Sequence, residues 1–433
     1  RGGIMAKKIY IGLLGLGTIG TGVARIIDGH QHKIKQVVGQ EVVIKTVLDR
    51  DIDKCKTFFG EAVHCTDNFD DILNDEEISI IVELIGYVPA AKDYISKALS
   101  AGKHVVSANK DLVALHGKEL VNLAKANKCD FLYEAAVAGG VPILRAITES
   151  FASDNIQKVM GIVNGTTNFM MTKMDKEGYS YDEALALAQE LGFAEKNPTS
   201  DVDGLDAARK MVILARLAFG TNDVTLDDVA VTGIRNVSIN DIKLANRLGY
   251  KIKLIGTAEK IDDSVNVEVG PVFVPESHPL ASVNNEMNAV FVAGEALGET
   301  MFYGAGAGEL PTATAVVSDV MNIAKNILLE TTGNVFNEYE VETLIAKPEQ
   351  VINPVFMRLE VTDRAGQFLE LAKIFATAQV SFDKIIQEPL ANGKAIIVIV
   401  THPMSKAQEN EIIQAMEDND DMKLKVHFKV LEH

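Results

Sequence analysis

Asp206 and Lys210 have the types and the spacing of an acid–base pair. They stand in the run EKNPTSDVDGLDAARK (Glu195–Lys210), a polar, acidic segment that leads into a helix. Positions i and i+4 lie one turn apart on one helix face, so the carboxylate can partner the ammonium. The same stripe continues to Ile213 and Leu217, so this face should be partly buried, where an ammonium needs a partner. An ordinary surface ion pair worth about 0.3–0.5 kcal/mol has the same spacing.

A glycine-rich segment near the N-terminus is typical of dinucleotide binding. Gly15, Gly17 and Gly20 form the pattern G-x-G-x-x-G between an expected strand at 8–14 and an expected helix. The first glycine allows a tight turn, the second lets backbone approach a pyrophosphate, and the third lets helix and strand pack closely. The N–H groups at the helix start then face the phosphates. A purely structural glycine turn is the alternative.

The end of the second expected strand, 42–48, bears on the choice of cofactor. Asp49 and Arg50 follow it directly. An acid here binds a ribose hydroxyl in NAD enzymes, whereas an arginine holds the 2′-phosphate of NADP. Lys54 could assist Arg50. Because both residue types are present, the choice between NAD and NADP stays open, and a charged loop without a ligand is equally compatible.

Strands and helices alternate along the first third of the chain. Further strands are expected at 79–85, 105–106 and 130–133, and helices at 90–99 and 118–126. This alternation predicts an α/β fold with a doubly wound parallel sheet of the Rossmann type. Ligands bind at the carboxyl ends of such strands. Lys110 lies just past one of them, so it is a candidate cation near the nicotinamide or the substrate, or else a surface lysine at a helix start.

The segment Glu134–Pro142 ends the last of these strands. Its Gly-Gly-x-Pro sequence is irregular, which frees main-chain carbonyls from sheet pairing. Carbonyls together with one carboxylate would suit a hard monovalent cation. A plain loop between two domains is the simpler interpretation.

The pattern changes after residue 140. A strand at 156–163, the polar turn NGTTN, helices at 181–191 and 241–248, and strands at 251–258 and 265–274 predict an α+β substrate domain. The glycine loop 304–308 runs into a helix at 312–329 and is a second place where backbone can approach a cofactor. Residues 355–430 are expected to fold in the βαββαβ, ferredoxin-like order. The predicted organisation is a dinucleotide-binding domain at 5–140 completed by the helix at about 312–330, a substrate, catalytic and dimerisation domain at 141–311, a linker at 331–350 and a last domain at 351–433.

Composition excludes several classes of partner. The 42 basic and 60 acidic residues give a net charge of −18, which disfavours nucleic acid and anionic membranes. No apolar run reaches the ~18 residues of a membrane helix. The three cysteines, Cys55, Cys65 and Cys129, are odd in number and lack C-x-x-C spacing. They argue against a disulfide framework and a zinc cage and for a reducing, cytoplasmic location.

These pieces together closely resemble the homoserine dehydrogenases of the monofunctional bacterial type with a C-terminal ACT domain. The resemblance covers nearly the whole chain and rests on GLGTIGTGV, SANKDL, EAAVAGGVPI, GIVNGTTNF, GFAEKNPTSDVDGLDAARK and GETMFYGAGAGELPTAT. Asn197 stands where the family has an aspartate. The resemblance implies reduction of aspartate 4-semialdehyde to homoserine with NAD(P)H, in the route to threonine and methionine.

Residue matching to the family assigns roles to individual positions. Lys210 matches the catalytic lysine that gives a proton to the alkoxide, and Asp206 matches its carboxylate partner. Glu195 and Asp201 match positions that bind the amino group and hydroxyl of the substrate. The positions that match cofactor contacts lie in the fingerprint and in three other segments: Leu16, Thr18, Ile19, Arg50, Ala108, Lys110 and Gly308.

The resemblance also implies a sodium site, a regulatory ligand and an assembly. Glu134 and the carbonyls of Val137, Gly139 and Val141 match a structural Na+ site. Asp49 departs from the apolar residue expected beside the arginine that favours the 2′-phosphate. Threonine is expected to bind the ACT domain, between domains or subunits, in a homodimer or homotetramer. The rival interpretations are a dehydrogenase of another small hydroxy or amino acid, and a non-catalytic cofactor or amino-acid sensor.

Overall fold

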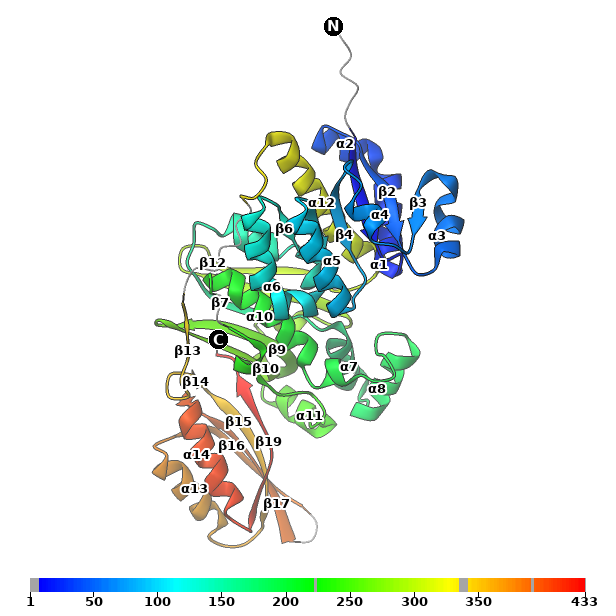
Figure 1. Cartoon of the computed structure of the whole chain (residues 1–433). Coiled ribbons are helices and arrows are strands. Elements are labelled where there is room, and N and C mark those ends of the chain that lie inside the picture. Colours follow the sequence, from blue (N-terminus) through cyan, green and yellow to red (C-terminus); the bar gives the residue numbers. More distant parts are fainter. Residues whose placement is uncertain (1–7, 222–223, 335–341, 391–392, 433) are drawn as a thin grey trace. The chain divides into compact units, whose positions relative to one another are not determined.

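The computed structural model describes residues 8–221, 224–334, 342–390 and 393–432, and the predicted start of the first domain at residue 5 lies outside them. The chain divides into two compact units, each assembled from segments far apart in the sequence (Figure 1). Unit 1 contains Arg1–Ile156, Val212–Leu226 and Asn288–Glu342, and unit 2 contains Gln157–Met211, Asp227–Met287 and Thr343–His433.

Unit 1 is built on a six-stranded sheet whose order is β3-β2-β1-β4-β5-β6. Every pair is parallel, which confirms the predicted doubly wound sheet. The order reverses between β1 and β4, and ligands of such sheets bind beside the carboxyl ends of the strands at that point. The strands are β1 (Ile9–Leu14), β2 (Val42–Leu48), β3 (His64–Thr66), β4 (Ile78–Glu83), β5 (His104–Ser107) and β6 (Phe131–Leu132).

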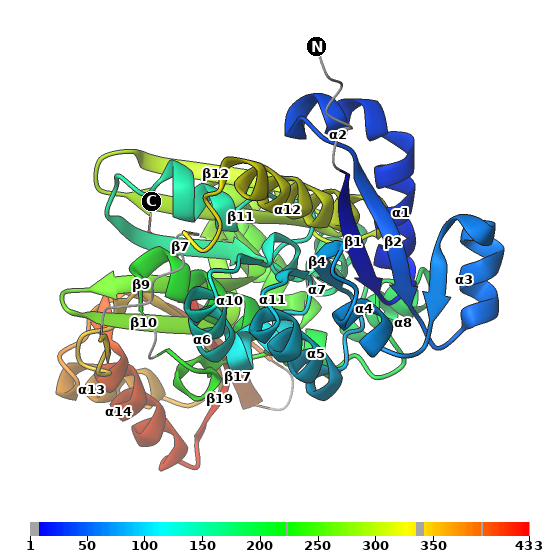
Figure 2. The ribbon, with the colours of Figure 1, turned by 45° about the horizontal axis from the view of Figure 1, so that its top comes forward.

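Helices pack around this sheet, and Figure 2 shows α1 (Thr18–Gly29) beside β1 and β2. Helix α12 (Glu309–Leu329), predicted at 312–329, packs on α1. A Cβ atom on Gly22 would come within 2.8 Å of the Glu309 carbonyl oxygen, so the two helices approach closely only because this residue is glycine. The other helices of the unit are α2 (Gln31–Val38), α3 (Ile52–Phe59), α4 (Asp70–Leu73), α5 (Val88–Ser100) and α6 (Lys110–Ala126).

Helix α6 begins eight residues before the predicted start at 118. The side chain of Asn109 caps it by accepting a hydrogen bond from the Leu112 N–H. Gly117 lies inside the helix, and the Arg216 guanidinium lies against this turn and donates to the Ala114 carbonyl. Tertiary contact therefore extends the helix past a residue of low helix propensity. Two strands that were not predicted, β11 (Met287–Gly294) and β12 (Gly298–Ala305), precede α12.

Unit 2 contains a mixed sheet of order β7-β9-β10-β19-β15-β17-β16. Strands β9 (Tyr250–Ile261) and β10 (Ser264–Pro275) pair antiparallel over their whole length, and β7 (Ile156–Ile162) pairs antiparallel with β9. The helices that carry the polar residues of interest are α7 (Gly165–Glu177), α8 (Tyr181–Glu190), α9 (Thr199–Val202), α10 (Leu205–Phe219) and α11 (Ile239–Arg247).

The C-terminal segment follows the predicted βαββαβ order. It consists of β15 (Val355–Thr362), α13 (Gln367–Thr377), β16 (Phe382–Pro389), β17 (Lys394–Thr401), α14 (Lys406–Glu417) and β19 (Met422–Val430). Its sheet joins that of the preceding part, because β19 pairs with β10 through Val272 and Phe273. The ring of Phe273 also stacks on Phe356 at 4.1 Å between centroids.

Short strands lie within and around this segment. They are β8 (Ala230–Val231), β13 (Leu344–Ile345), β14 (Ile352–Asn353) and β18 (Met404–Ser405). Strand β13 pairs with β10, so part of the expected linker is paired to the sheet. No helix in the described part of the chain is long and apolar enough to cross a membrane.

Candidate active site and cofactor site

Lys210 lies in the second turn of α10 and is held on two sides. Its Nζ donates to Oδ2 of Asp206 at 2.8 Å and to the carbonyl oxygen of Val163, just past β7, at 2.6 Å. The two side chains are only 12% and 9% exposed, so this is not a surface ion pair. An ammonium has three N–H donors. Two are used here, which leaves the third for an oxygen atom of a ligand.

Asn164 joins two carboxylates of this cluster. Its Nδ2 donates to Asp201 Oδ1 at 2.7 Å and to Asp206 Oδ2 at 2.9 Å. Its Oδ1 accepts from the N–H of Thr167 at 2.9 Å, so the same side chain caps α7. Sequence reasoning placed Asn164 in a polar turn and gave it no role. The only local signal was an asparagine at a helix start, because its partners lie 37 and 42 residues further along the chain.

Glu195 is not part of this cluster. The residue is exposed, and its main-chain carbonyl accepts from Nε2 of Gln189 at 3.0 Å. Within the described residues, the Glu195 carboxylate makes no hydrogen bond or ion pair. The structure therefore brings Asp201, Asp206 and Lys210 together through Asn164 and leaves Glu195 apart, and its substrate contact stays a prediction.

The three fingerprint glycines have the backbone that a dinucleotide requires. Gly15 has φ +97°, and a Cβ there would be 2.9 Å from the Leu84 carbonyl oxygen. A Cβ on Gly20 would be 2.1 Å from the Gly15 carbonyl oxygen, so the helix packs too closely for a side chain. A Cβ on Gly17 would meet nothing within 4 Å, which leaves open space where the pyrophosphate approaches. Leu16, Thr18 and Ile19 lie between them, and Thr18 is the first residue of α1.

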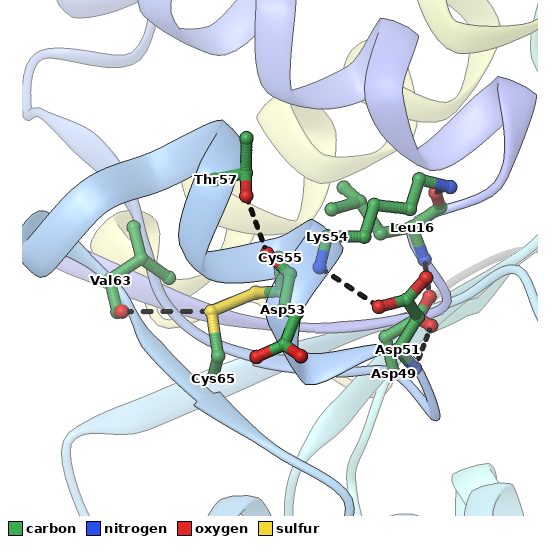
Figure 3. Close-up of a disulfide and its surroundings, with 9 residues drawn as sticks. All are labelled: Leu16, Asp49, Asp51, Asp53, Lys54, Cys55, Thr57, Val63 and Cys65. Atoms are coloured by element: carbon green, nitrogen blue, oxygen red, sulfur yellow. Dashed lines mark hydrogen bonds between the residues drawn. A yellow bond between two sulfur atoms is a disulfide. The ribbon is translucent and has the colours of Figure 1, made fainter.

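Asp49 lies at the carboxyl end of β2 and is tied to the fingerprint (Figure 3). Its Oδ2 accepts from the Leu16 N–H at 2.6 Å, and its Oδ1 accepts from the Asp51 N–H at 2.9 Å. The Nζ of Lys54 donates to the Leu16 carbonyl at 2.6 Å rather than reaching toward Arg50. Arg50 is exposed, and among the described residues its guanidinium has no hydrogen-bond or ion-pair partner.

Cys55 and Cys65 form a disulfide beside this loop, with their Cα atoms 6.0 Å apart (Figure 3). The cysteine spacing argued against a disulfide framework, yet this one pair is joined. Their separation of 10 residues matches no motif, but α3 and β3 lie next to each other and bring the two thiols together. Cys129 remains a buried free thiol, and burial raises its pKa to about 11.

The ends of β4 and β5 carry a buried polar pair. Oε2 of Glu83 accepts from the Ser107 hydroxyl at 2.6 Å, and Oε1 accepts from the Ile85 N–H at 2.8 Å. Burial raises the pKa of the Glu83 carboxyl. Ala108 follows, and Lys110 is the first residue of α6, half-buried, so it lies at the carboxyl end of a strand as predicted. Both residues belong to unit 1, as does the fingerprint.

The candidate cation loop has irregular, buried backbone. Ala138 and Gly139 have φ +52° and +51°, and a Cβ on Gly139 would be 2.4 Å from the Gly306 carbonyl oxygen. Val137, Ala138 and Val141 are buried. Gly308, with φ +114°, caps the following helix α12.

The carboxylate of Glu134 is held by the backbone that follows this loop. Its two oxygens accept from the N–H groups of Leu144 and Arg145, each at 2.8 Å. Burial raises its pKa, and burial together with the nearby Glu134 raises that of Asp319 to about 7. No group of three or more His, Cys, Asp or Glu side chains in the described residues could hold a metal ion. The expected cation ligands, Glu134 and the carbonyls of Val137, Gly139 and Val141, therefore stay a prediction.

Known proteins that match this chain are homoserine dehydrogenases, and the matches cover nearly its whole length. Residues 15–134 match the NAD binding domain of homoserine dehydrogenase and residues 142–321 match the homoserine dehydrogenase family model. The homoserine dehydrogenase of Bacillus subtilis is 49% identical over 414 residues, covering 95% of each chain.

Solved structures agree with these matches. A homoserine dehydrogenase from Thiobacillus denitrificans has a TM-score of 0.93 and 35% identity, covering 98% of this chain and 99% of that one. A hyperthermophilic archaeal homoserine dehydrogenase in complex with NADPH has a TM-score of 0.63 and 26% identity, covering 75% of this chain and 98% of that one. The fingerprint and these matches establish NAD(P) as the cofactor. The chain belongs to the homoserine dehydrogenase family.

Proposed function

We propose that Lys210 is the proton donor in the reversible reduction of L-aspartate 4-semialdehyde to L-homoserine. When bound, NAD(P)H supplies the hydride that reaches the aldehyde carbon, and the carbonyl oxygen becomes an alkoxide. The third N–H of Lys210 stabilises that charge and then gives its proton to the oxygen. The observation that supports this role is the ammonium held by Asp206 and the Val163 carbonyl with one donor left over.

Asp206 and Asp201 divide the remaining tasks. Asp206 fixes the direction of the Lys210 side chain and balances its charge in a site where both are mostly buried. Asp201, tied to Asp206 through Asn164, and Glu195 would bind the amino group and hydroxyl of the substrate. Lys110, Ala108, Arg50, Gly308 and the fingerprint residues would hold the cofactor.

Replacing Lys210 by Ala tests the assignment. We expect kcat to fall by roughly 10²-fold or more, while the dissociation constant of the reduced cofactor, measured by calorimetry, stays the same. Normal turnover of aspartate semialdehyde by the K210A variant would refute the role. Loss of cofactor binding together with turnover would show a general folding defect instead.

We further propose that residues 351–433 form an ACT domain that binds threonine in a homodimer or homotetramer and lowers activity. The βαββαβ order and the turn Asp363–Gly366, where Gly366 has φ +92°, support this proposal. Because β19 pairs with β10, removing the segment would expose a strand edge, so a point variant is the better test. We expect threonine to inhibit the full chain and Asp363→Ala to raise the inhibition constant by about tenfold. Identical threonine curves for both proteins would contradict it.

A structural Na+ ion held by Glu134 and by the carbonyls of Val137, Gly139 and Val141 completes the proposal. Positive φ at Ala138 and Gly139 turns this backbone out of any sheet, which supports carbonyl ligation. Thermal unfolding in sodium chloride and in choline chloride at equal ionic strength should differ by a few degrees if the ion binds the folded state. Equal midpoints would remove the ion from the proposal.

A further inference from the structure

The carboxylate of Asp49 is fixed at the place where a dinucleotide-binding fold distinguishes its two cofactors. It lies at the carboxyl end of β2, beside the first two fingerprint glycines. In this fold, that position faces the ribose of the adenosine, where NAD carries a 2′-hydroxyl and NADP a 2′-phosphate. We propose that Asp49 makes NAD(H) the preferred cofactor of this chain, an inference that rests on the proposed dehydrogenase function.

Two backbone hydrogen bonds hold the carboxylate in position. The Leu16 N–H binds Oδ2 at 2.6 Å and the Asp51 N–H binds Oδ1 at 2.9 Å. An ionised carboxylate has about four lone-pair sites, so each oxygen can still accept a hydrogen bond from a ribose hydroxyl. The same oxygens repel a phosphate dianion, and the two backbone bonds oppose any rotation that would move them away.

Arg50 is the residue that opposes this preference. Its guanidinium could pair with a 2′-phosphate, but it is exposed and, in the described part of the chain, unpartnered. It must lose side-chain freedom to bind, whereas Asp49 is already fixed. The ammonium of Lys54 is hydrogen-bonded to the Leu16 carbonyl in the fingerprint. It would have to break this bond to join Arg50 in binding a 2′-phosphate.

The surroundings of the loop keep this arrangement in place. The side chain of Asp51 accepts from the Lys54 N–H at 2.9 Å and thereby caps α3. The next residue, Cys55, ties α3 to β3 through its disulfide with Cys65 (Figure 3). The start of α3 is therefore held twice, by the Asp51 cap and by the disulfide of Cys55. The Asp51 N–H that binds Asp49 cannot shift without moving the disulfide-linked helix.

The cofactor preference can be measured with and without chemistry. For the full chain we would determine kcat/KM for NADH and NADPH with aspartate semialdehyde, and the dissociation constants of both cofactors by calorimetry without substrate. We expect NADH to be favoured by about tenfold or more in both measurements. A preference for NADPH in the binding measurement would overturn the proposal. Absence of turnover with a preserved NADH preference in calorimetry would overturn the proposed reaction but not the role of Asp49.

Variants of Asp49 show whether its carboxylate selects the cofactor or only stabilises the loop. Asp49→Ala, and Asp49→Asn as the variant closest in shape, should weaken NADH binding and strengthen NADPH binding, changing the affinity ratio by about tenfold or more. The affinity for NADPH gained by D49A should be lost again in D49A/R50A. Equal weakening of both cofactors by D49A and by D49N would show that Asp49 only supports the loop and would overturn the proposal.

Asp53→Ala is the matched control. Asp53 is an exposed carboxylate in the first turn of α3, four residues along from Asp49. Removing it changes the net charge of the loop by the same amount without touching the fingerprint. We expect its affinity ratio to move by less than about twofold, because an exposed charge is screened by solvent and salt. A shift as large as that of D49A would mean that overall loop charge, not the fixed carboxylate, selects the cofactor.

Discussion

Lys210 and Lys253 both place an ammonium against the segment that opens α7, but they have different partners. Lys210 binds the carboxylate of Asp206 and one carbonyl. Lys253 is only 3% exposed and binds neutral oxygens alone: the Val283 carbonyl at 2.5 Å and the side-chain oxygens of Asn168 and Asn284 at 3.3 Å each. Burial lowers the pKa of Lys253 to about 8.

The difference shows what a carboxylate adds to a partly buried lysine. Neutral acceptors satisfy the N–H groups of Lys253, but they only partly replace the water lost on burial, so its proton is held weakly. Asp206 instead places an opposite charge 2.8 Å from the Lys210 ammonium and fixes its direction. Lys253 links β9 to α7 and to the 283–284 loop, which is a structural role. Lys210 has the carboxylate partner that a proton donor needs.

Asp206→Asn would give Lys210 the kind of partners that Lys253 has. The amide keeps the size of the side chain but removes its charge, so the ammonium would be held by neutral oxygens only. We expect kcat/KM for aspartate semialdehyde to fall by about 10²-fold because the charge that orients the ammonium is lost. Steady-state rates of the variant and the wild type would measure this effect.

Asp203→Asn is the control for this variant. Asp203 is three residues away and pairs with Arg235 at the surface, so its loss should change kcat/KM by less than about twofold. If D206N kept full activity, the charge of Asp206 would have no role in proton donation, and the functional distinction between Lys210 and Lys253 would be lost.

Replacing Asn164 would disturb the same cluster indirectly. In Asn164→Ala, Asp201 and Asp206 lose their shared donor, and α7 loses a cap worth about 1 kcal/mol. We expect kcat/KM to fall by roughly tenfold because the Asp206 side chain is less well oriented. Asn164→Asp keeps the cap but sets a third carboxylate against the other two, so we expect it to lower kcat/KM further than N164A.

N164D should keep the helix cap that N164A loses, yet have the lower kcat/KM. This difference separates the effect of orienting Asp206 from the effect of stabilising α7. Urea unfolding should show N164D to be at least as stable as N164A if the cap dominates stability, while its kcat/KM is lower. Activities that simply follow the free energies of unfolding of the two variants would argue that Asn164 has only a structural role.

Local patterns allowed much of the fold to be predicted. Hydrophobic runs, glycine turns and the alternation of elements gave the parallel sheet of unit 1 and the C-terminal βαββαβ order, with most boundaries within three residues. The signals failed where tertiary contact overrides propensity. Gly117 lies inside α6 because the Arg216 side chain packs on that turn, and β12 escaped prediction because its residues are mostly polar or half-exposed.

The residues of the candidate site were also predictable only where the signal is local. Asp206 and Lys210 were identified because their spacing within one helix is a local property. Asn164 and Val163 were not, because they approach α10 from 42 and 47 residues away. The Cys55–Cys65 bond likewise depends on the packing of α3 against β3. Contacts between distant segments carry no periodic signal in one sequence.

Lys253 should leave a signature in the pH dependence of stability. Its folded-state pKa of about 8 lies below its ordinary value of 10.5, so between these values the unfolded chain binds more protons than the folded one. The free energy of unfolding should therefore rise with pH across this window, by about 3 kcal/mol at most. Lys253→Met should lack this rise in urea unfolding series, and its kcat should change by less than about threefold because it lies outside the acid–base pair.

Lys260→Met is the control for that series. Lys260 lies on β9, the strand that carries Lys253, but it is exposed, so its removal should leave the slope of stability against pH unchanged. Equal slopes for the wild type and K253M would mean that Lys253 keeps its proton in the folded state. The neutral partners of Lys253 would then hold its proton firmly, and the contrast drawn with Lys210 would fail.

The smallest effect is expected at a pair with the same spacing as Asp206 and Lys210. Asp93 and Lys97 are also i and i+4 on a helix, α5, and their Nζ–Oδ2 distance is 2.7 Å, but the side chains are 52% and 53% exposed. Water and salt compete for both charges, so the pair should add little to stability. Asp93→Asn should keep kcat/KM within about twofold of the wild type and leave the urea midpoint almost unchanged, most clearly at high salt. A loss of activity comparable to that of D206N would show that i,i+4 spacing, and not burial beside Asn164 and Val163, gives such a pair its effect.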